Sequence, residues 1–233
     1  WLRAQEWLIP GRCVLCLGRA GGEVLCAGCL RDLPWIQAGC VRCGVTLGAP
    51  GTCPACQRRP PPWHGALVAC RYQEPARSLV LRLKYRGALA CGTALGAVLA
   101  ARVAAAGSTA DLLVPVPLHR ERLRERGFNQ AGVIALEAGR RLGIEVAVDA
   151  ATRPLATPRQ ARARSVRERR RNLAGAFTAR SGRVEGRRVA MVDDVLTTGS
   201  TVSGLGSALA AAGAARVDAW VCCRAETAAD AAP

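Results

Sequence analysis

The feature that most restricts the fold of this chain is a repeated set of paired cysteines near its N-terminus. Nine residues separate the pairs within each unit, and the second unit begins 27 residues after the first. Each C-x-x-C turn directs two thiolates at one point, and two turns complete a tetrahedral site for zinc. The spacing therefore predicts two structural Zn²⁺ sites. The eight expected ligands are Cys13, Cys16, Cys26, Cys29, Cys40, Cys43, Cys53 and Cys56.

Other uses of these cysteines are a redox or disulfide role and an iron–sulfur cluster, which the spacing fits poorly. Twelve cysteines would indicate disulfides in a secreted chain. Residues 1–12 lack the layout of a secretory signal, so we expect a cytoplasmic protein that binds metal. We favour pairing within each unit, with interleaved pairing across the units as the alternative. Structural zinc contributes about 10–16 kcal/mol in finger peptides, enough to order so small a module.

The composition divides the chain into a cysteine module over residues 1–60, a Pro-rich linker over 61–66, a larger domain over 67–227 and an Ala-rich tail over 228–233. Half of the residues are hydrophobic, which is typical of a globular protein. No apolar run approaches the roughly 18–20 residues of a membrane span, so none is expected.

Apolar runs alternate with helical patterns through the larger domain, which predicts an α/β fold with a parallel sheet flanked by helices. The expected strands are Leu67–Tyr72, Leu112–Pro115, Glu145–Val148, Val189–Asp193 and Arg216–Cys223. The expected helices are Glu74–Lys84, Ala88–Ala106, Asn129–Leu142 and Ser200–Ala212. Residues 153–172 carry eight Arg against one Glu without an apolar period, which predicts a long loop of the kind that is functional or disordered.

The strongest functional signal is the segment Val189–Thr201, in which an apolar strand ends in two acids and a short polar loop precedes a helix. Backbone N–H groups at a helix N-terminus face a phosphate, and the helix dipole favours its charge. A glycine in the loop allows close approach of the backbone, and hydroxyls donate further hydrogen bonds. The loop residues are Thr197, Thr198, Gly199, Ser200 and Thr201.

Two simpler explanations of this segment are weaker. A Walker B strand of an NTPase would need a G-x-x-x-x-G-K-[ST] loop elsewhere, and the sequence contains none. An ordinary helix cap would explain Ser200 or Thr201, but it would not explain the paired acids Asp193 and Asp194.

This segment resembles the phosphoribosyl-pyrophosphate signature of type I phosphoribosyltransferases. Nearly the whole chain is similar to the ComF family of competence-associated proteins, which join a double zinc ribbon to such a domain. The matching segments outside the signature are Leu83–Gly87, Val114–Arg120, Arg126–Gln130 and a stretch from Thr157 through Gln160 to Arg169 and Asn172.

The resemblance implies a role for each matching segment. Asp193 and Asp194 would bind the ribose hydroxyls, and Thr197–Thr201 would bind the 5′-phosphate. The loop after the first core strand would contact pyrophosphate; it comprises Val116, Pro117, Leu118, His119 and Arg120. A flap over pyrophosphate would correspond to residues 153–172 and would offer Arg162, Arg167 and Arg169. The resemblance also implies Mg²⁺ bound with phosphoribosyl pyrophosphate.

A formal net charge of +16 favours phosphate-bearing partners, either a small polyphosphate or nucleic acid. A biased composition explains Arg in place of Lys, but not the shortage of acids. Two functions follow: transfer of a phosphoribosyl group to an unidentified acceptor in nucleotide metabolism, or a non-catalytic adaptor in DNA uptake that binds single-stranded DNA or a helicase. The acceptor site and a general base are not identifiable from the sequence.

Overall fold

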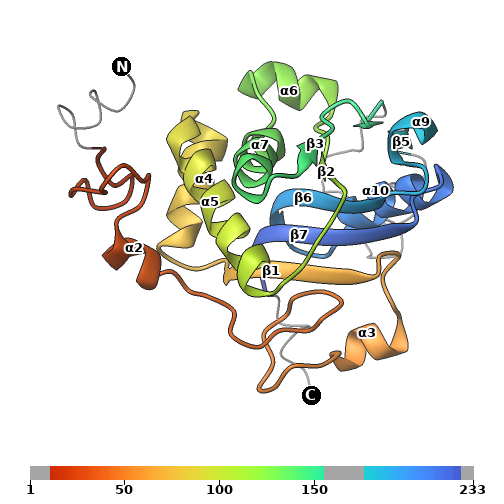
Figure 1. The fold of residues 1–233 in the computed structure, drawn as a ribbon, viewed down its shortest axis with the longest axis horizontal. Coiled ribbons are helices and arrows are strands. Elements are labelled where there is room, and N and C mark those ends of the chain that lie inside the picture. The colour runs from red at the N-terminus through yellow and green to blue at the C-terminus, as the bar shows by residue number, and fades with distance from the viewer. Residues whose placement is uncertain (1–10, 155–175, 227–233) are drawn as a thin grey trace.

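The computed structural model describes residues 11–154 and 176–226 (Figure 1). Its centre is a five-stranded parallel sheet with the strand order β1-β7-β6-β2-β3. The strands are β1 (Gly65–Arg71), β2 (Leu112–Pro115), β3 (Glu145–Val146), β6 (Arg188–Leu196) and β7 (Arg216–Arg224). A short antiparallel pair, β4 (Ala151–Thr152) and β5 (Thr178–Ala179), lies apart from this sheet.

Helices cover both faces of the sheet, so the expected α/β class is confirmed. One face carries α4 (Ala76–Arg86), α5 (Leu89–Ala105) and α7 (Gln130–Leu142), whereas α10 (Ser200–Ala211) packs on the other (Figure 1). The shorter helices are α2 (Ala27–Arg31), α3 (Pro54–Arg58), α6 (Arg120–Arg126) and α9 (Ser181–Val184).

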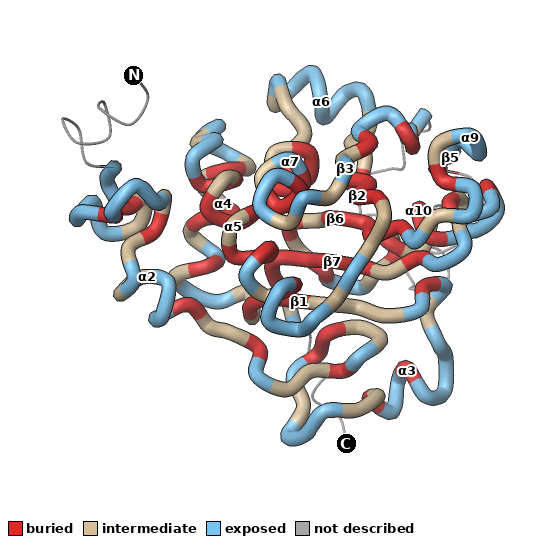
Figure 2. Tube along the Cα trace, in the orientation of Figure 1, coloured by how far each residue is buried: buried red, intermediate tan, exposed pale blue. Residues whose placement is uncertain are grey.

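The apolar run of β6 is continuous because strands of a parallel sheet are buried from both sides. Val189 to Val192 are all buried, and Figure 2 shows β6 and β7 at the buried centre of the molecule. Small residues bring α5 against α7: a Cβ on Gly96 would lie 2.7 Å from the carbonyl oxygen of Ile134.

The two cysteine units contact different parts of the α/β domain (Figure 1). In the first unit, Leu25 and Leu33 share a core cluster with α4 and α5, and Glu23 forms an ion pair with Arg141 of α7. The second unit lies along the free edge of β1, where the N–H of Ala66 donates to the carbonyl of Val41 at 2.8 Å. The second unit therefore covers a sheet edge that would otherwise be exposed.

Several boundaries differ from those expected. The strand expected at Glu145–Val148 ends at Val146, and β1 begins at Gly65, inside the stretch expected as linker. The basic loop of residues 153–172 lies outside the described residues from position 155 onward. Among the residues that are described, no helix is long and apolar enough to span a membrane.

Candidate zinc centres and candidate phosphate-binding pocket

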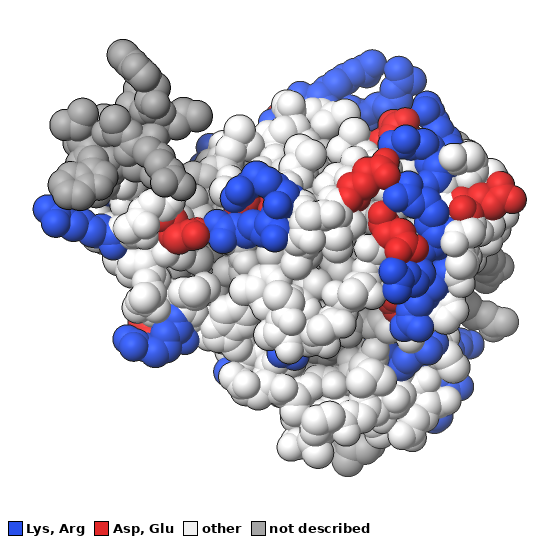
Figure 3. Space-filling view, in the orientation of Figure 1, with Lys and Arg blue, Asp and Glu red and all other residues white. Residues whose placement is uncertain are grey.

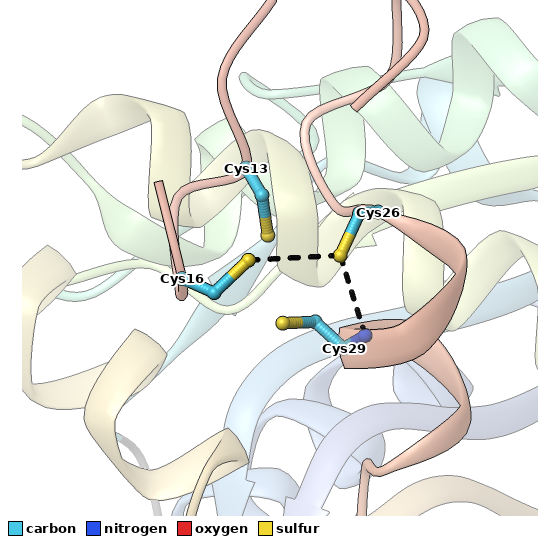
Figure 4. Close-up of side chains that lie close together, drawn as sticks. All are labelled: Cys13, Cys16, Cys26 and Cys29. Carbon is cyan, nitrogen blue, oxygen red and sulfur yellow. Dashed lines mark hydrogen bonds between the residues drawn. The ribbon is translucent and has the colours of Figure 1, made fainter. Parts of the chain in front are cut away.

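The eight paired cysteines form two clusters, one in each unit of the N-terminal module. Within each cluster all four Sγ atoms lie within 4.8 Å of one another. The Sγ atoms of Cys16 and Cys26 are 3.7 Å apart in the first cluster (Figure 4), as are those of Cys43 and Cys53 in the second. Four thiolates at 2.3 Å from one zinc ion would be separated by about 3.8 Å. The clusters therefore fit tetrahedral zinc, with pairing within each unit.

Backbone N–H groups directed at sulfur favour the thiolate form that binds metal. The N–H groups of Arg42 and Cys53 lie 3.4 Å and 3.3 Å from Cys40 Sγ. Burial raises the pKa of Cys40, but these N–H groups outweigh it and hold the pKa at about 7. Burial likewise raises the pKa of Cys13, but backbone N–H groups outweigh it and lower that pKa to about 6. Outside the clusters, the cysteines at positions 70, 91, 222 and 223 are buried.

A pocket of about 250 Å³ opens at the carboxyl ends of β2 and β6, where open α/β sheets bind ligands. It brings together segments that are far apart in the sequence: the end of α4, the loop after β2, and the turn from β6 into α10. Its lining residues are Tyr72, Lys84, Val116, Pro117, Leu118, Arg122, Gln130, Arg153, Asp193, Asp194, Val195, Thr197 and Thr201.

The two acids at the end of β6 differ in their partners. Lys84 Nζ lies 2.9 Å from Asp194 Oδ2, and these side chains are only 19% and 4% exposed. The Asp193 carboxylate accepts a hydrogen bond from the N–H of Asp194 at 2.9 Å. Burial, together with the charge of Asp194, raises the pKa of Asp193 to about 7 despite the opposing charge of Lys84. The pocket thus holds one ion-paired acid and one acid that readily binds a proton.

The turn between β6 and α10 has the shape that a phosphate site needs. Gly199 adopts φ +72°, a left-handed conformation that glycine tolerates best, and it forms the N-cap of the twelve-residue helix α10. The hydroxyls of Thr198 and Ser200 lie 2.8 Å apart. Arg224, at the end of β7, donates to the carbonyl oxygens of Leu196 and Thr197 at 3.1 Å and 2.7 Å, which holds the start of the turn in place.

The structure places the other expected site residues in three groups. Val116, Pro117 and Leu118 line the pocket, whereas His119 and Arg120 begin α6 beside it. His119 caps that helix, since its Nδ1 accepts from the N–H of Glu121 at 3.4 Å. The expected flap residues at positions 162, 167 and 169 lie outside the described residues.

Five lining residues were not among the individually expected site residues: Tyr72, Lys84, Arg122, Gln130 and Val195. Arg153, which also lines the pocket, begins the stretch 153–172 that was expected as the flap. One of the five carried a signal, because Lys84 is the only lysine among 33 basic residues. The guanidinium of Arg153 also stacks 5.2 Å from the centre of the Phe177 ring. Tyr72, Arg122 and Gln130 could not be found from spacing, because the tertiary fold alone brings them to this strand edge.

A comparison with known families matches the N-terminal module of the chain. The double zinc ribbon domain family matches residues 4–57, which include all eight clustered cysteines. Among solved structures, the allosteric regulatory enzyme of purine biosynthesis aligns with a TM-score of 0.40 and 24% identity. The glutamine phosphoribosylpyrophosphate amidotransferase of B. subtilis aligns with a TM-score of 0.39 and 22% identity. Each alignment covers 56% of this chain and 25% of the other.

Two relatives align over almost their entire length. The DNA utilization protein YhgH of Escherichia coli K12 is 35% identical over 231 residues, covering 93% of this chain and 98% of the relative. Competence protein F of Haemophilus influenzae is 32% identical over 223 residues, covering 92% and 97%. With two Cys₄ zinc sites in an N-terminal double zinc ribbon and a parallel α/β domain behind it, the chain belongs to the ComF family.

Proposed function

We propose that this chain binds phosphoribosyl pyrophosphate with Mg²⁺ in the pocket at the ends of β2 and β6. The observation that carries this proposal is the convergence of an acid pair, a helix N-terminus rich in hydroxyls, and the loop after β2 on one pocket. A compact sugar with phosphates at both ends matches these groups. Carboxylates accept hydrogen bonds from ribose hydroxyls, and helix N-termini bind phosphate.

Each segment takes a distinct part of the ligand in this proposal. Asp193 and Asp194 hold the ribose hydroxyls, and Thr197–Thr201 holds the 5′-phosphate. Residues 116–120 lie against the pyrophosphate; the arginines expected as its flap, at positions 162, 167 and 169, lie outside the described residues. When bound, Mg²⁺ would offset the charge of the pyrophosphate. Before ligand arrives, Lys84 neutralises Asp194, and its shift toward ligand oxygens would leave the acid free to accept from a hydroxyl.

Transfer of the phosphoribosyl group would pass through an oxocarbenium-like transition state at C1 of the ribose. The bond from C1 to the pyrophosphate oxygen breaks, its electron pair leaves with pyrophosphate, and an acceptor forms the new bond at C1. The pocket contributes position and positive charge at the leaving group, which are the main sources of rate in such a site. Relatives of the chain are named DNA utilization protein and competence protein F, which supports a role for this proposed chemistry in DNA use.

Calorimetric titration of phosphoribosyl pyrophosphate with Mg²⁺ tests this proposal. We expect micromolar binding to the zinc-loaded wild type and at least about a hundredfold weaker binding to Asp193→Asn/Asp194→Asn, since hydrogen bonds to charged groups contribute about 1.5–3 kcal/mol each. Asp32→Asn is the matched control, because Asp32 is an exposed acid in the first zinc ribbon. A zinc-loaded wild type that binds no ligand would overturn the proposal.

A second candidate function is that of a DNA-binding adaptor, and the surface of α6 favours it. Among the described residues, Arg120, Arg122 and Arg124 form no ion pair, and basic side chains gather over α6 at the upper edge of Figure 3. Arginine side chains grip phosphate backbones without sequence preference. Single-stranded DNA should then bind with a steep salt dependence, and Arg120→Gln/Arg124→Gln should reduce the log–log slope by about 1–2. Absence of binding at low salt would remove this candidate.

A further inference from the structure

One aromatic side chain connects the second zinc ribbon to the candidate phosphate-binding turn. Trp63 follows three consecutive prolines between the ribbon and β1, and it is only 4% exposed. Its ring lies against Gly199: a Cβ built on that glycine would be 3.1 Å from Trp63 Cη2. The ring shares its core cluster with Leu196, before the turn, and Val202, in the first turn of α10.

The indole nitrogen of the same side chain hydrogen-bonds the Cys40–Cys43 turn of the second zinc ribbon. The indole Nε1–H donates to the carbonyl oxygen of Arg42 at 2.7 Å. Arg42 lies between Cys40 and Cys43, and its own N–H lies 3.4 Å from Cys40 Sγ. One residue therefore bonds both the zinc-binding thiolate and the indole that supports the phosphate-binding turn.

The Arg42 side chain strengthens this connection by hydrogen-bonding the backbone on both sides of Trp63. Its Nη1 donates to the carbonyl of His64 at 2.8 Å, and its Nη2 donates to the carbonyl of Pro61 at 3.3 Å. His64 in turn hydrogen-bonds the start of β7 through Val217. The segment that carries the indole is thus hydrogen-bonded both to the Cys40–Cys43 turn and to the central sheet.

We infer that zinc in the second ribbon orders the phosphate-binding turn through Trp63, so that this metal site controls ligand binding in the α/β domain. This inference rests on the proposed function of the turn. Loss of the metal releases the backbone of Cys40–Cys43, and with it the acceptor of a buried indole N–H. A buried donor without its acceptor is costly, so the indole moves and Gly199 loses its support. The ligand must then order the turn on binding, which weakens affinity.

The first ribbon provides an internal comparison, because it contacts a different part of the domain. Its core residues pack on α4 and α5, and among the described residues it makes no hydrogen bond or ion pair with the turn from β6 to α10. Metal loss there would disturb those helices and leave Gly199 supported. The inference therefore predicts that two chemically equivalent zinc sites have unequal effects on the phosphate site.

Hydrogen–deuterium exchange on the full chain tests this difference without any ligand. The probe is the amide of Ser203, which donates to the carbonyl of Gly199 at 2.8 Å. We expect its exchange to rise at least about tenfold in Cys43→Ser and Trp63→Phe, and to stay within about twofold in Cys16→Ser, with amides of α7 unchanged in Trp63→Phe. Zinc analysis should find both ions retained in Trp63→Phe, which removes only the link.

Binding of phosphoribosyl pyrophosphate to the same variants separates this inference from the proposed function. Affinity should fall at least about tenfold in Trp63→Phe and Cys43→Ser, and stay within about twofold in Cys16→Ser. Equal exchange at Ser203 in all variants, or equal losses of affinity after substitution in either ribbon, would overturn the link. Ligand binding to the wild type would stand unaffected by that result. If exchange at Ser203 is faster only in Cys43→Ser and Trp63→Phe, and the wild type binds no ligand, the link is supported and the proposed function is refuted.

Discussion

Replacing Lys84 by Met should destabilise the protein far more than loss of a surface ion pair. Lys84 Nζ lies 2.9 Å from Asp194 in the pocket, and Asp193 immediately precedes Asp194 in β6. Removing one partner of a buried pair costs about 3–5 kcal/mol, because it leaves an uncompensated charge. Lys84 keeps some exposure, so we expect a loss at or somewhat below the lower end of that range, about 2–3 kcal/mol at pH 8.

The pH dependence of this loss follows from the acids that remain. Lys84 lowers the pKa of Asp193, so without the cation that folded pKa rises further above the unfolded value of about 3.9. A raised carboxyl pKa leaves stability unaffected at low pH and lowers it as pH rises above the unfolded value. The difference between wild type and Lys84→Met should therefore be larger at pH 8 than at pH 5. In the wild type, Asp194 raises the pKa of Lys84 against the opposing effect of burial, so the cation persists throughout this range.

Urea unfolding measures these free energies in the wild type, Lys84→Met, Lys84→Met/Asp194→Asn and Arg77→Met. Adding Asp194→Asn to Lys84→Met should restore about 1–2 kcal/mol, since it removes the stranded charge. Arg77→Met is the matched control on the same helix: its pair with Glu74 is 3.3 Å long and both side chains are about half exposed. We expect a change within about 0.5 kcal/mol there. An equally small change in Lys84→Met would refute the account of the pocket charges.

Three further predictions concern Asp193, the second ribbon and the metal. Burial and Asp194 raise the pKa of Asp193 to about 7, so Asp193→Asn should raise stability by about 1–3 kcal/mol at pH 8 and by almost nothing at pH 4, as measured by thermal unfolding. A Cβ on Gly44, at φ +69°, would lie 2.1 Å from Val68 Cγ2, so Gly44→Ala should cost about 2–4 kcal/mol, whereas Gly48→Ala, in open space, should cost under about 1 kcal/mol. Metal analysis should find about two zinc ions per chain, and a strong chelator should unfold the N-terminal module and speed exchange at Ser203 while β6 keeps its exchange protection.

The sequence was most informative where pattern and local chemistry agree. The apolar run of β6, its terminal acids and the Thr/Gly/Ser turn follow one another along the chain, so β6 and the start of α10 were predicted within a few residues. The regular cysteine spacing likewise predicted the zinc clusters, although pairing within each unit was settled only by the positions of the sulfur atoms. The helix expected at Asn129–Leu142 begins at Gln130, and the Asn129 side chain caps it by accepting from the N–H of Ala131.

Contacts between distant segments could not be predicted in the same way. Lys84 lies 110 positions before Asp194, and no periodicity links a residue late in α4 to the end of β6. Trp63 looked like part of a stiff linker, because its burial depends on the second ribbon, β1 and α10 meeting around it. The helix α6 was not predicted, because its seven residues include a single hydrophobic side chain and so form no apolar pattern.

Phosphorus NMR of phosphoribosyl pyrophosphate with Mg²⁺, titrated with the zinc-loaded protein, tests the central claim most directly. It resolves the 5′-phosphate and both pyrophosphate phosphorus atoms separately. We expect all three resonances to shift or broaden with the wild type. In Thr198→Ala/Ser200→Ala, which removes two hydroxyls from the turn, the change at the 5′-phosphate should be reduced more than the changes at the pyrophosphate. Resonances that stay unchanged in the presence of excess wild-type protein would contradict this claim, because the pocket would then hold no phosphoribosyl ligand.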